Sequence, residues 1–446
     1  MLVYSDKEKE MPKGNFIYSD KERGMPKGHF KIIKLPVDES HYNEEAEKGE
    51  KLKIYRTGRE YRYIGIYEEI INNKQIEIKE KEYINILEYL RSRKYLFGIA
   101  EFELMPASFA VFHEIALDPE NFPTFSVSAP AFFPYFLDFL GVKIVELIEK
   151  EAMKVDKNMR DKVIPDFKTG IPGDWDPDNT NGICVPGSVR YKENIENHKA
   201  ELEKRIEIFE TEAVKFYKKY EDEALRKDLG IKKPLTMEEL FKNIRHHFLN
   251  QNKLGKFKGF PDLPNKLTYI GGIVVEDKGI LTQKHKNQIN NPKCVVYVSF
   301  GTVKADGGLG GLGDEKYKAM LNIFEKYDCL FQIRIDKDDL KDEYKGTNKH
   351  FSTEPLKQQE ILCNTAMYAG VPLICIPYFS DQWYNASLIE YLGIGIYVKN
   401  NNDYGNKKVK PEDKIDDKFI EKIEDALDKI LSEFKNKEFK LKEEST

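Results

Sequence analysis

The sequence predicts an α/β fold with two domains, and three observations support this prediction. Short apolar runs alternate with amphipathic helical patterns along most of the chain, which is typical of α/β rather than α+β proteins. The apolar run at residues 373–376 is followed by a polar turn and a helical pattern at residues 385–392, the order of a strand and helix in such a fold. The 446 residues exceed what one hydrophobic core usually holds, which indicates two domains.

An imperfect tandem repeat opens the chain. Its two copies are residues 4–16 (YSDKEKEMPKGNF) and residues 18–30 (YSDKERGMPKGHF). Two copies fall short of the three or more that a repeat fold needs to bury a core, so we expect residues 1–30 to lie outside the core. The elements expected next are a strand at residues 29–36, a strand at 95–100, a helix at 108–115 and a strand at 124–128.

The middle of the chain contains a predicted loop and a predicted domain boundary. Residues 154–187 are rich in Asp, Pro, Gly and Asn, which is typical of a loop or an insertion. A long helix is expected at residues 193–220, and the prolines in residues 260–264 indicate a linker. The expected parts are therefore one domain at residues 31–262, a second at 263–410, and an amphipathic helix with a tail at 411–446.

Charge and cysteine content exclude some classes of protein. The chain carries 71 basic and 76 acidic residues, so its net charge of −5 predicts no basic surface and no nucleic-acid partner. Five cysteines without a C-x-x-C pair predict neither a zinc site nor a disulfide framework. Cys294, Cys329 and Cys375 lie in apolar runs, where a buried free thiol is the default expectation.

No segment has the pattern of a membrane span. The most apolar region, residues 129–147, is interrupted by Pro130, Pro134 and Asp138, so we expect no transmembrane helix there. The N-terminal sequence MLVYSDKEKEMPKG lacks the apolar stretch of a signal peptide. The location of the protein therefore stays open.

Asp381 and Gln382 are candidate ligand contacts. They follow the apolar run at residues 373–376, and ligands of parallel sheets bind at the carboxyl ends of the strands. A carboxylate beside a side-chain amide can hydrogen-bond vicinal sugar hydroxyls.

A second candidate contact follows the apolar run at residues 294–298. Ser299, Gly301 and Thr302 lie there, in the turn Ser-Phe-Gly-Thr. A glycine and small hydroxyls at a strand end allow backbone amides to approach a phosphate.

These segments resemble the signature of the UDP-glycosyltransferase family, which includes the UDP-glucuronosyltransferases. The matching residues are the turn at residues 299–302, Ala369-Gly370-Val371-Pro372, Ile376-Pro377, Asp381-Gln382 and Asn385-Ala386. The resemblance implies a GT-B architecture, in which two Rossmann-like domains face a cleft. The first domain would bind the acceptor and the second the UDP-sugar. Family members commonly reside at the endoplasmic reticulum membrane and act in detoxification.

The resemblance also implies roles for single residues. Glu101, which follows the strand at residues 95–100, stands where the family has a carboxylate that orients the catalytic base, and Glu103 is the second choice. The implied donor contacts are Asp381 and Gln382 for the sugar, Ser299, Gly301 and Thr302 for the diphosphate, and Gln358 for the uridine.

The implied reaction is inverting transfer of glucuronic acid or a hexose from a UDP-sugar to a small lipophilic hydroxyl compound. It would use no metal ion and no cofactor besides the UDP-sugar itself. A homo-oligomer is an open alternative for the assembly. His113, His246 and His247 are interpreted as structural histidines whose hydrogen bonds are satisfied within the fold.

The chain departs from the family pattern at two places. Only Cys363, Asn364 and Thr365 separate Leu362 from Ala366, where the family has a further strand and a His-Gly-Gly turn. His29 and His41 lie nearest to the expected position of the catalytic base, but both are interpreted as ordinary surface histidines, which leaves the base unassigned. These departures keep a second interpretation open, namely an inactive relative or an incomplete gene product.

A third interpretation is an NAD-linked oxidoreductase. Gly308, Gly310 and Gly313 match the G-x-G-x-x-G pattern of dinucleotide sites. In such sites the first glycine directly follows the strand, whereas here residues 301–307 intervene. We therefore rank this interpretation last.

Overall fold

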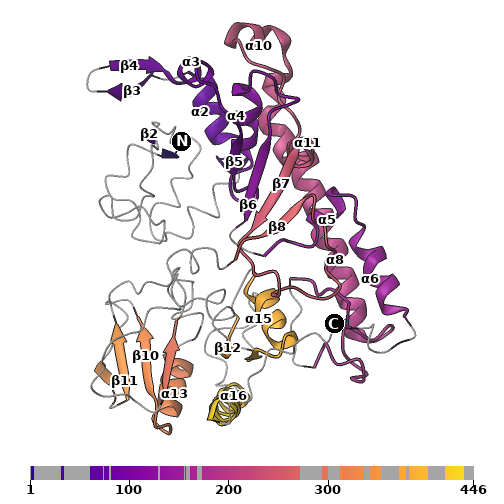
Figure 1. Cartoon of the computed structure of the whole chain (residues 1–446), viewed down its shortest axis with the longest axis vertical. Coiled ribbons are helices and arrows are strands. Elements are labelled where there is room, and N and C mark those ends of the chain that lie inside the picture. The colour runs from indigo at the N-terminus through magenta and orange to yellow at the C-terminus, as the bar shows by residue number, and fades with distance from the viewer. Residues whose placement is uncertain are drawn as a thin grey trace. The chain divides into compact units, whose positions relative to one another are not determined.

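The computed structural model describes the chain in several segments. These are residues 2–4 and 32–34; 61–271 except 74, 80–81, 129–130, 155, 157–160 and 168–172; 294–299; 312–399 except 313, 336–341, 345, 347, 353–370 and 378–380; and 417–435. The chain divides into two compact units, coloured along the sequence in Figure 1. Unit 1 comprises Met1–Val142, Ala200–Leu249 and Leu263–Thr268, and unit 2 comprises Lys143–Lys199, Asn250–Asp262 and Tyr269–Thr446.

Unit 1 is built on a four-stranded sheet with the order β5-β6-β7-β8. The strands are β5 (Gly98–Ala100), β6 (Thr124–Ser128), β7 (Ile244–Leu249) and β8 (Leu267–Tyr269). β6 pairs in parallel with both β5 and β7. Two smaller sheets are β1 (Leu2–Tyr4) with β2 (Ile32–Lys34), and β3 (Gln75–Lys79) with β4 (Glu82–Asn85).

The helices of unit 1 bury aromatic side chains. Phe102 contacts Phe109, Phe136 and Phe241 with ring centroids 5.3, 6.3 and 5.0 Å apart, which is the geometry of favourable aromatic packing. Thr236 and Glu239 form a capping box at the start of α11. The helical elements are η3 (Tyr61–Gly65), α2 (Ile66–Ile71), α3 (Ile86–Arg91), α4 (Ala107–Ile115), α5 (Phe136–Phe139), η4 (Ile208–Glu212), α9 (Ala213–Tyr217), η5 (Lys218–Glu221), α10 (Glu223–Leu229) and α11 (Met237–Lys242).

Unit 2 contains two parallel sheets. One has the order β11-β10-β9, and the other pairs β12 with β13. Its strands are β9 (Val295–Val298), β10 (Leu330–Arg334), β11 (Lys349–Ser352), β12 (Leu373–Cys375) and β13 (Gly395–Tyr397). Its helices are α6 (Ile144–Ala152), α13 (Asp314–Phe324), η8 (Asp342–Tyr344), α15 (Gln382–Tyr391) and α16 (Asp417–Lys435), while α8 (Val189–Glu207) continues into unit 1.

One apolar core of unit 2 joins α13 and α16 with strands of both sheets. Phe324 of α13 stacks on Phe331 of β10 with ring centroids 4.2 Å apart. Phe419 and Ile423, on the apolar side of α16, are buried in the same core, and Ile374 of β12 packs against it. Both units thus combine helices with parallel strands, which confirms the predicted α/β class.

Several expected elements are found close to their predicted positions. The strand at residues 124–128 is β6, and the helix at residues 108–115 is α4 with one more residue at its start. The C-terminal amphipathic helix is α16, and its apolar positions are those that pack in the core. The helix expected at residues 193–220 is instead divided into α8, η4, α9 and η5.

The prediction of free thiols at Cys294 and Cys329 is wrong, because these two residues form a disulfide. Cys294 directly precedes β9 and Cys329 directly precedes β10, and the register pairs Val295 with Leu330. The two cysteines are therefore neighbours on adjacent strands, with their Cα atoms 4.7 Å apart, within disulfide range. Cys184 and Cys375 are not part of this disulfide.

Across the part of the chain that the structure describes, no helix combines the length and the apolar character that a membrane span requires.

Candidate functional site

The predicted donor contacts that the structure describes lie at element ends in unit 2. Ser299 directly follows β9, and Asp381 directly precedes α15. Gln382, the first residue of α15, is exposed. The side chain of Asn385 donates a hydrogen bond to Asp381 over 3.1 Å, which helps to orient that carboxylate. Gly301, Thr302 and Gln358 lie outside the described residues.

Aromatic rings from distant parts of the sequence hold α15 in unit 2. Tyr384, which is buried, stacks on Phe167 with centroids 5.0 Å apart and contacts Phe257 at 5.1 Å. Tyr391 contacts Phe257 at 5.1 Å and Trp175 at 5.4 Å. Residues 161–167 and 173–187, which belong to the segment predicted as a loop or insertion, contain no helix or strand but contribute buried side chains to this packing.

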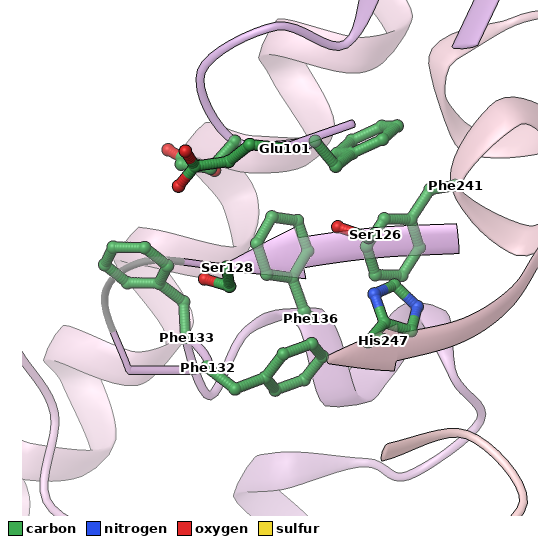
Figure 2. Close-up of a pocket in the computed structure, with 10 residues that line it drawn as sticks. Glu101, Ser126, Ser128, Phe132, Phe133, Phe136, Phe241 and His247 are labelled. Carbon is green, nitrogen blue, oxygen red and sulfur yellow. The ribbon is translucent and has the colours of Figure 1, made fainter. Parts of the chain in front are cut away.

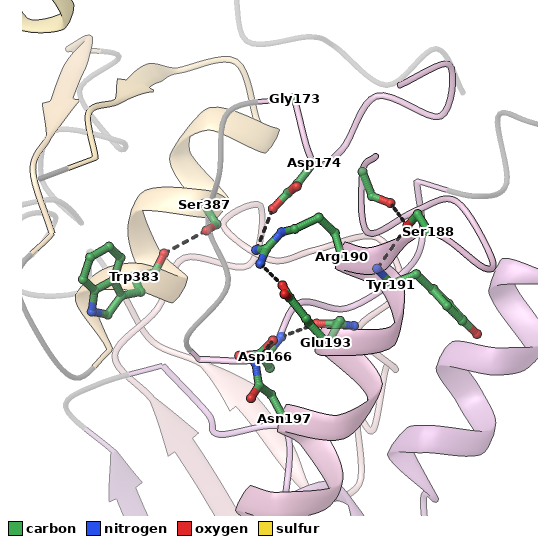
Figure 3. Close-up of polar contacts among 12 residues, drawn as sticks. Asp166, Gly173, Asp174, Ser188, Arg190, Tyr191, Glu193, Asn197, Trp383 and Ser387 are labelled. Atoms are coloured by element: carbon green, nitrogen blue, oxygen red, sulfur yellow. Dashed lines mark hydrogen bonds and ion pairs between the residues drawn. The ribbon is translucent and has the colours of Figure 1, made fainter. Parts of the chain in front are cut away.

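Polar contacts also hold residues 161–167 and 173–187 against α8. Figure 3 shows Arg190 between Asp174 and Glu193, and both carboxylates form ion pairs with its guanidinium. Asn194 accepts a hydrogen bond from the backbone N–H of Asp166 over 2.7 Å and donates one to the carbonyl of Ile164 over 3.0 Å. These bonds satisfy backbone groups that lack sheet or helix partners.

Glu390 of α15 lies close to this polar cluster. Burial raises its pKa to about 7, and the negative charge of Asp174 adds to the effect, while Lys429 of α16 opposes it. The carboxyl of Glu390 therefore titrates near neutral pH.

A pocket in unit 1 lies at the carboxyl edge of the parallel strands β5, β6 and β7. Its enclosed space is about that of one water molecule, and the 280 Å³ of empty space counted around it includes open solvent. Figure 2 shows its labelled side chains, with phenylalanine rings around a few polar groups. The lining residues are Glu101, Phe102, Glu103, Ser126, Ser128, Phe132, Phe133, Phe136, Phe241 and His247.

Glu101 and Glu103 have different surroundings in this pocket. Glu103 accepts a hydrogen bond from the guanidinium of Arg205 over 2.9 Å, and Arg205 also donates to the hydroxyl of Tyr135 over 2.6 Å. The guanidinium also lies over the ring of Tyr135, 4.7 Å from its centroid. Glu103 is thus held in a structural ion pair. Glu101 directly follows β5, the position at which the candidate carboxylate was expected.

Of the three histidines that the sequence analysis interpreted as structural, one does not fit that interpretation. Nε2 of His113 lies 3.2 Å from the carbonyl of Lys233, and Nε2 of His246 lies 2.6 Å from the hydroxyl of Thr268, so both are satisfied as predicted. His247 is 97 % buried, yet its Nε2 has no hydrogen-bond partner among the described residues. The interpretation of His247 as a satisfied structural histidine is therefore wrong, and leaving such an atom unpaired costs about 1–3 kcal/mol.

His247 is neutral at physiological pH. Burial is the main cause that lowers the pKa of His247 to about 3, and the electrostatic effects of Lys266 and His246 lower it further. A group of such low basicity is a poor general base. The catalytic base therefore stays unassigned.

No group of acidic, histidine or cysteine side chains within the described ranges could hold a metal ion.

Comparison of the sequence with known proteins finds partial matches. No protein-family model matches the chain. It is similar to ugt-47 of Caenorhabditis elegans, whose name assigns it provisionally to the UDP-glucuronosyltransferases, with 30% identity over 194 residues, 38% of this chain and 35% of the relative. The ugt-47 of Caenorhabditis briggsae, named in the same way, is 30% identical over 182 residues, 36% of this chain and 33% of the relative. The chain thus spans about a third of the length of these relatives.

Comparison of the structure with solved structures finds similar chains of low sequence identity. Os79 from O. sativa in complex with UDP has 13% identity and a TM-score of 0.49, covering 94% of this chain and 84% of that chain. A UDP-glucose:anthocyanidin 3-O-glucosyltransferase in complex with UDP has 12% identity and a TM-score of 0.43, covering 82% and 73%.

Proposed function

Since the chain is a member of the UDP-glycosyltransferase family, we propose that it transfers a sugar from a UDP-sugar to a small lipophilic hydroxyl compound. The sugar is glucuronic acid or a hexose. The observation that carries the proposal is the unit 1 pocket, which combines phenylalanine walls with Glu101 at the carboxyl edge of a parallel sheet. Ligands of open α/β sheets bind at this edge, and apolar walls with few polar groups suit a lipophilic molecule.

In the proposed division of labour, unit 1 binds the acceptor and unit 2 binds the donor. Gln382 is exposed and Asp381 is oriented by Asn385, which supports a role for both in contacting sugar hydroxyls. Ser299 at the end of β9, with Gly301 and Thr302, would contact the diphosphate, and Gln358 the uridine.

The proposed chemistry is a single displacement that needs no metal ion. The acceptor oxygen attacks the anomeric carbon of the sugar, the bond to UDP breaks with its electron pair leaving on the diphosphate, and the configuration inverts. The acceptor proton passes to a base, and Glu101 would orient or stabilise that base as it becomes positively charged.

The proposal is tested by measuring UDP release with UDP-glucuronic acid and UDP-glucose as donors and 2-naphthol as acceptor. We expect turnover that falls about a hundredfold in Glu101→Gln with an unchanged KM for the acceptor. Asp381→Asn should raise the KM for the UDP-sugar about tenfold, because a hydrogen-bond acceptor for the sugar is weakened. Glu120→Gln is the matched control, since Glu120 is an exposed carboxylate of unit 1 away from the pocket.

Two outcomes would contradict this proposal in different ways. UDP binding in calorimetry without turnover across the donor panel would favour an inactive relative. Absence of UDP binding would remove the donor site itself from the proposal.

A further inference from the structure

The ring of Phe167 supports the helix at whose start the predicted sugar contacts lie. Phe167 stacks on Tyr384 of α15 with ring centroids 5.0 Å apart and ring planes inclined by 15°. Tyr384 comes three residues after Asp381, and residues three apart lie on the same side of a helix. The stack therefore acts on the first turn of α15, next to Asp381 and Gln382.

Tyr384 is held between two aromatic neighbours. Its side chain is buried, and the ring of Phe257 meets it edge-on, with centroids 5.1 Å apart and planes inclined by 70°. Stacked and edge-on pairs of this geometry stabilise a structure beyond the area that they bury. Removing the ring of Phe167 should therefore allow the first turn of α15 to shift.

The backbone that carries Phe167 is itself fixed by hydrogen bonds to α8. The side chain of Asn194 accepts a hydrogen bond from the backbone N–H of Asp166 over 2.7 Å and donates one to the carbonyl of Ile164 over 3.0 Å. Nε2 of His198, one turn further along α8, lies 3.1 Å from the same carbonyl. These residues are buried, so the bonds are shielded from water and strong. Phe167 thus reaches α15 from a segment that is anchored on α8.

We propose that Phe167 is a positioning residue for the donor sugar. By fixing the first turn of α15, it holds Asp381 and Gln382 where both can bond the sugar hydroxyls. Asn385 orients the carboxylate of Asp381, whereas Phe167 sets the position of the helix itself. A site whose parts are already in place loses less free energy to ordering when the sugar binds. This inference rests on the proposed function, because it takes Asp381 and Gln382 as contacts of the UDP-sugar.

Calorimetry on the full chain tests the proposal by comparing a UDP-sugar with UDP, which lacks the sugar. In Phe167→Ala, the Kd for UDP-glucose or UDP-glucuronic acid, whichever the unaltered chain binds, should rise about fivefold, as expected for loss of one aromatic pair. The Kd for UDP should stay within about twofold, because α15 contacts only the sugar in the proposed site. Phe167→Tyr keeps the stacked ring and should bind the UDP-sugar within about twofold of the unaltered chain. Phe167→Leu gives the same readout as Phe167→Ala if the alanine variant does not fold.

Tyr327→Ala is the matched control. Tyr327 is a half-buried residue of unit 2 that donates a hydrogen bond to Asp428 over 2.8 Å, and it lies before the start of β10, at the end of the strand opposite to its carboxyl end. This change should lower the melting temperature and leave both Kd values unchanged. If Phe167→Ala raises the Kd for UDP as much as that for the UDP-sugar, or changes neither, the role of Phe167 is overturned and the proposed function stands. If the unaltered chain binds no UDP-sugar, both proposals lose their donor site.

Discussion

At the scale of single residues, the two carboxylates of the unit 1 pocket show how neighbours decide what a side chain can do. Glu103 forms an ion pair with Arg205 and a hydrogen bond with Tyr135, and Glu101 lies two residues earlier, directly after β5. The sequence correctly predicted that Glu101 follows a strand, because the apolar run before it could be recognised locally. Separating the roles of Glu101 and Glu103 needed Arg205, which is about a hundred positions away in the sequence.

Replacing Arg205 with Met should destabilise unit 1 by about 3 kcal/mol. The change keeps much of the side-chain volume but leaves Glu103 without its ion pair in a half-buried site. Chemical denaturation followed by far-UV circular dichroism measures the loss. Lys199→Met is the control, because Lys199 and Glu196 form an exposed pair that contributes at most about 1 kcal/mol. Equal effects of the two changes would contradict the structural role of Arg205.

Glu390 should make the stability of unit 2 depend on pH. Its pKa is raised from the ordinary value of 4.5 to about 7, so between these values the folded chain holds a proton that the unfolded chain has released. Stability should therefore fall as the pH rises from about 4.5 to 7, by up to about 3 kcal/mol. Melting temperatures across this range measure the effect. Glu390→Gln should remove this slope and raise stability at pH 8, and an unchanged slope would refute the assignment to Glu390.

At the scale of elements, a strand irregularity explains why His247 was missed. Simple alternation along β7 from the buried Ile244 predicts His246 inward and His247 outward. The register shifts between Thr124 and Phe125, so that Phe125 pairs with His246 and one residue of β7 is extra. Such a bulge reverses the alternation after it, and local sequence gives no sign of it.

The stability of α15, which begins at Gln382 directly after Asp381, should depend on the ring of Phe257, which is distant in the sequence. Phe257 is fully buried and contacts both Tyr384 and Tyr391 of α15. Phe257→Ala should cost about 3–5 kcal/mol and increase hydrogen exchange of α15. Leu254→Ala is the control, since Leu254 is 67 % exposed and its truncation should have an effect within about 0.5 kcal/mol. Unchanged exchange in α15 after loss of Phe257 would show that other contacts hold the helix.

At the scale of the whole molecule, the sequence predicted the α/β class and the existence of two parts, because strand and helix patterns are local. The sequence did not show which segments belong to which of the two parts. Contacts between residues far apart, such as Phe167 with Tyr384, assign residues 143–199 to the same unit as α15. The disulfide was missed for a related reason, since only the pairing of β9 with β10 makes Cys294 and Cys329 neighbours.

Removing this disulfide should affect one unit only. The bridge closes a loop with a sequence separation of 35, so the double change Cys294→Ala and Cys329→Ala should destabilise unit 2 by about 3–4 kcal/mol. Hydrogen exchange resolved by peptide should show faster opening in β9 and β10 and no change in β5, β6 and β7. Cys375→Ala, which removes a cysteine of unit 2 that is outside the disulfide, is the control. An equal increase of hydrogen exchange in both units would contradict the expectation that the disulfide stabilises unit 2 alone.

The aromatic packing around α15 also limits how this protein can be recombined with its relatives. A chimaera cut at the linker near residues 260–264 would carry Tyr384 and Tyr391 but leave Phe167, Trp175 and Phe257 behind. The transplanted part would meet unmatched side chains from its new host. Exchange of the C-terminal part between such proteins therefore requires residues 143–199 and 250–262 to be transferred with it, in three pieces.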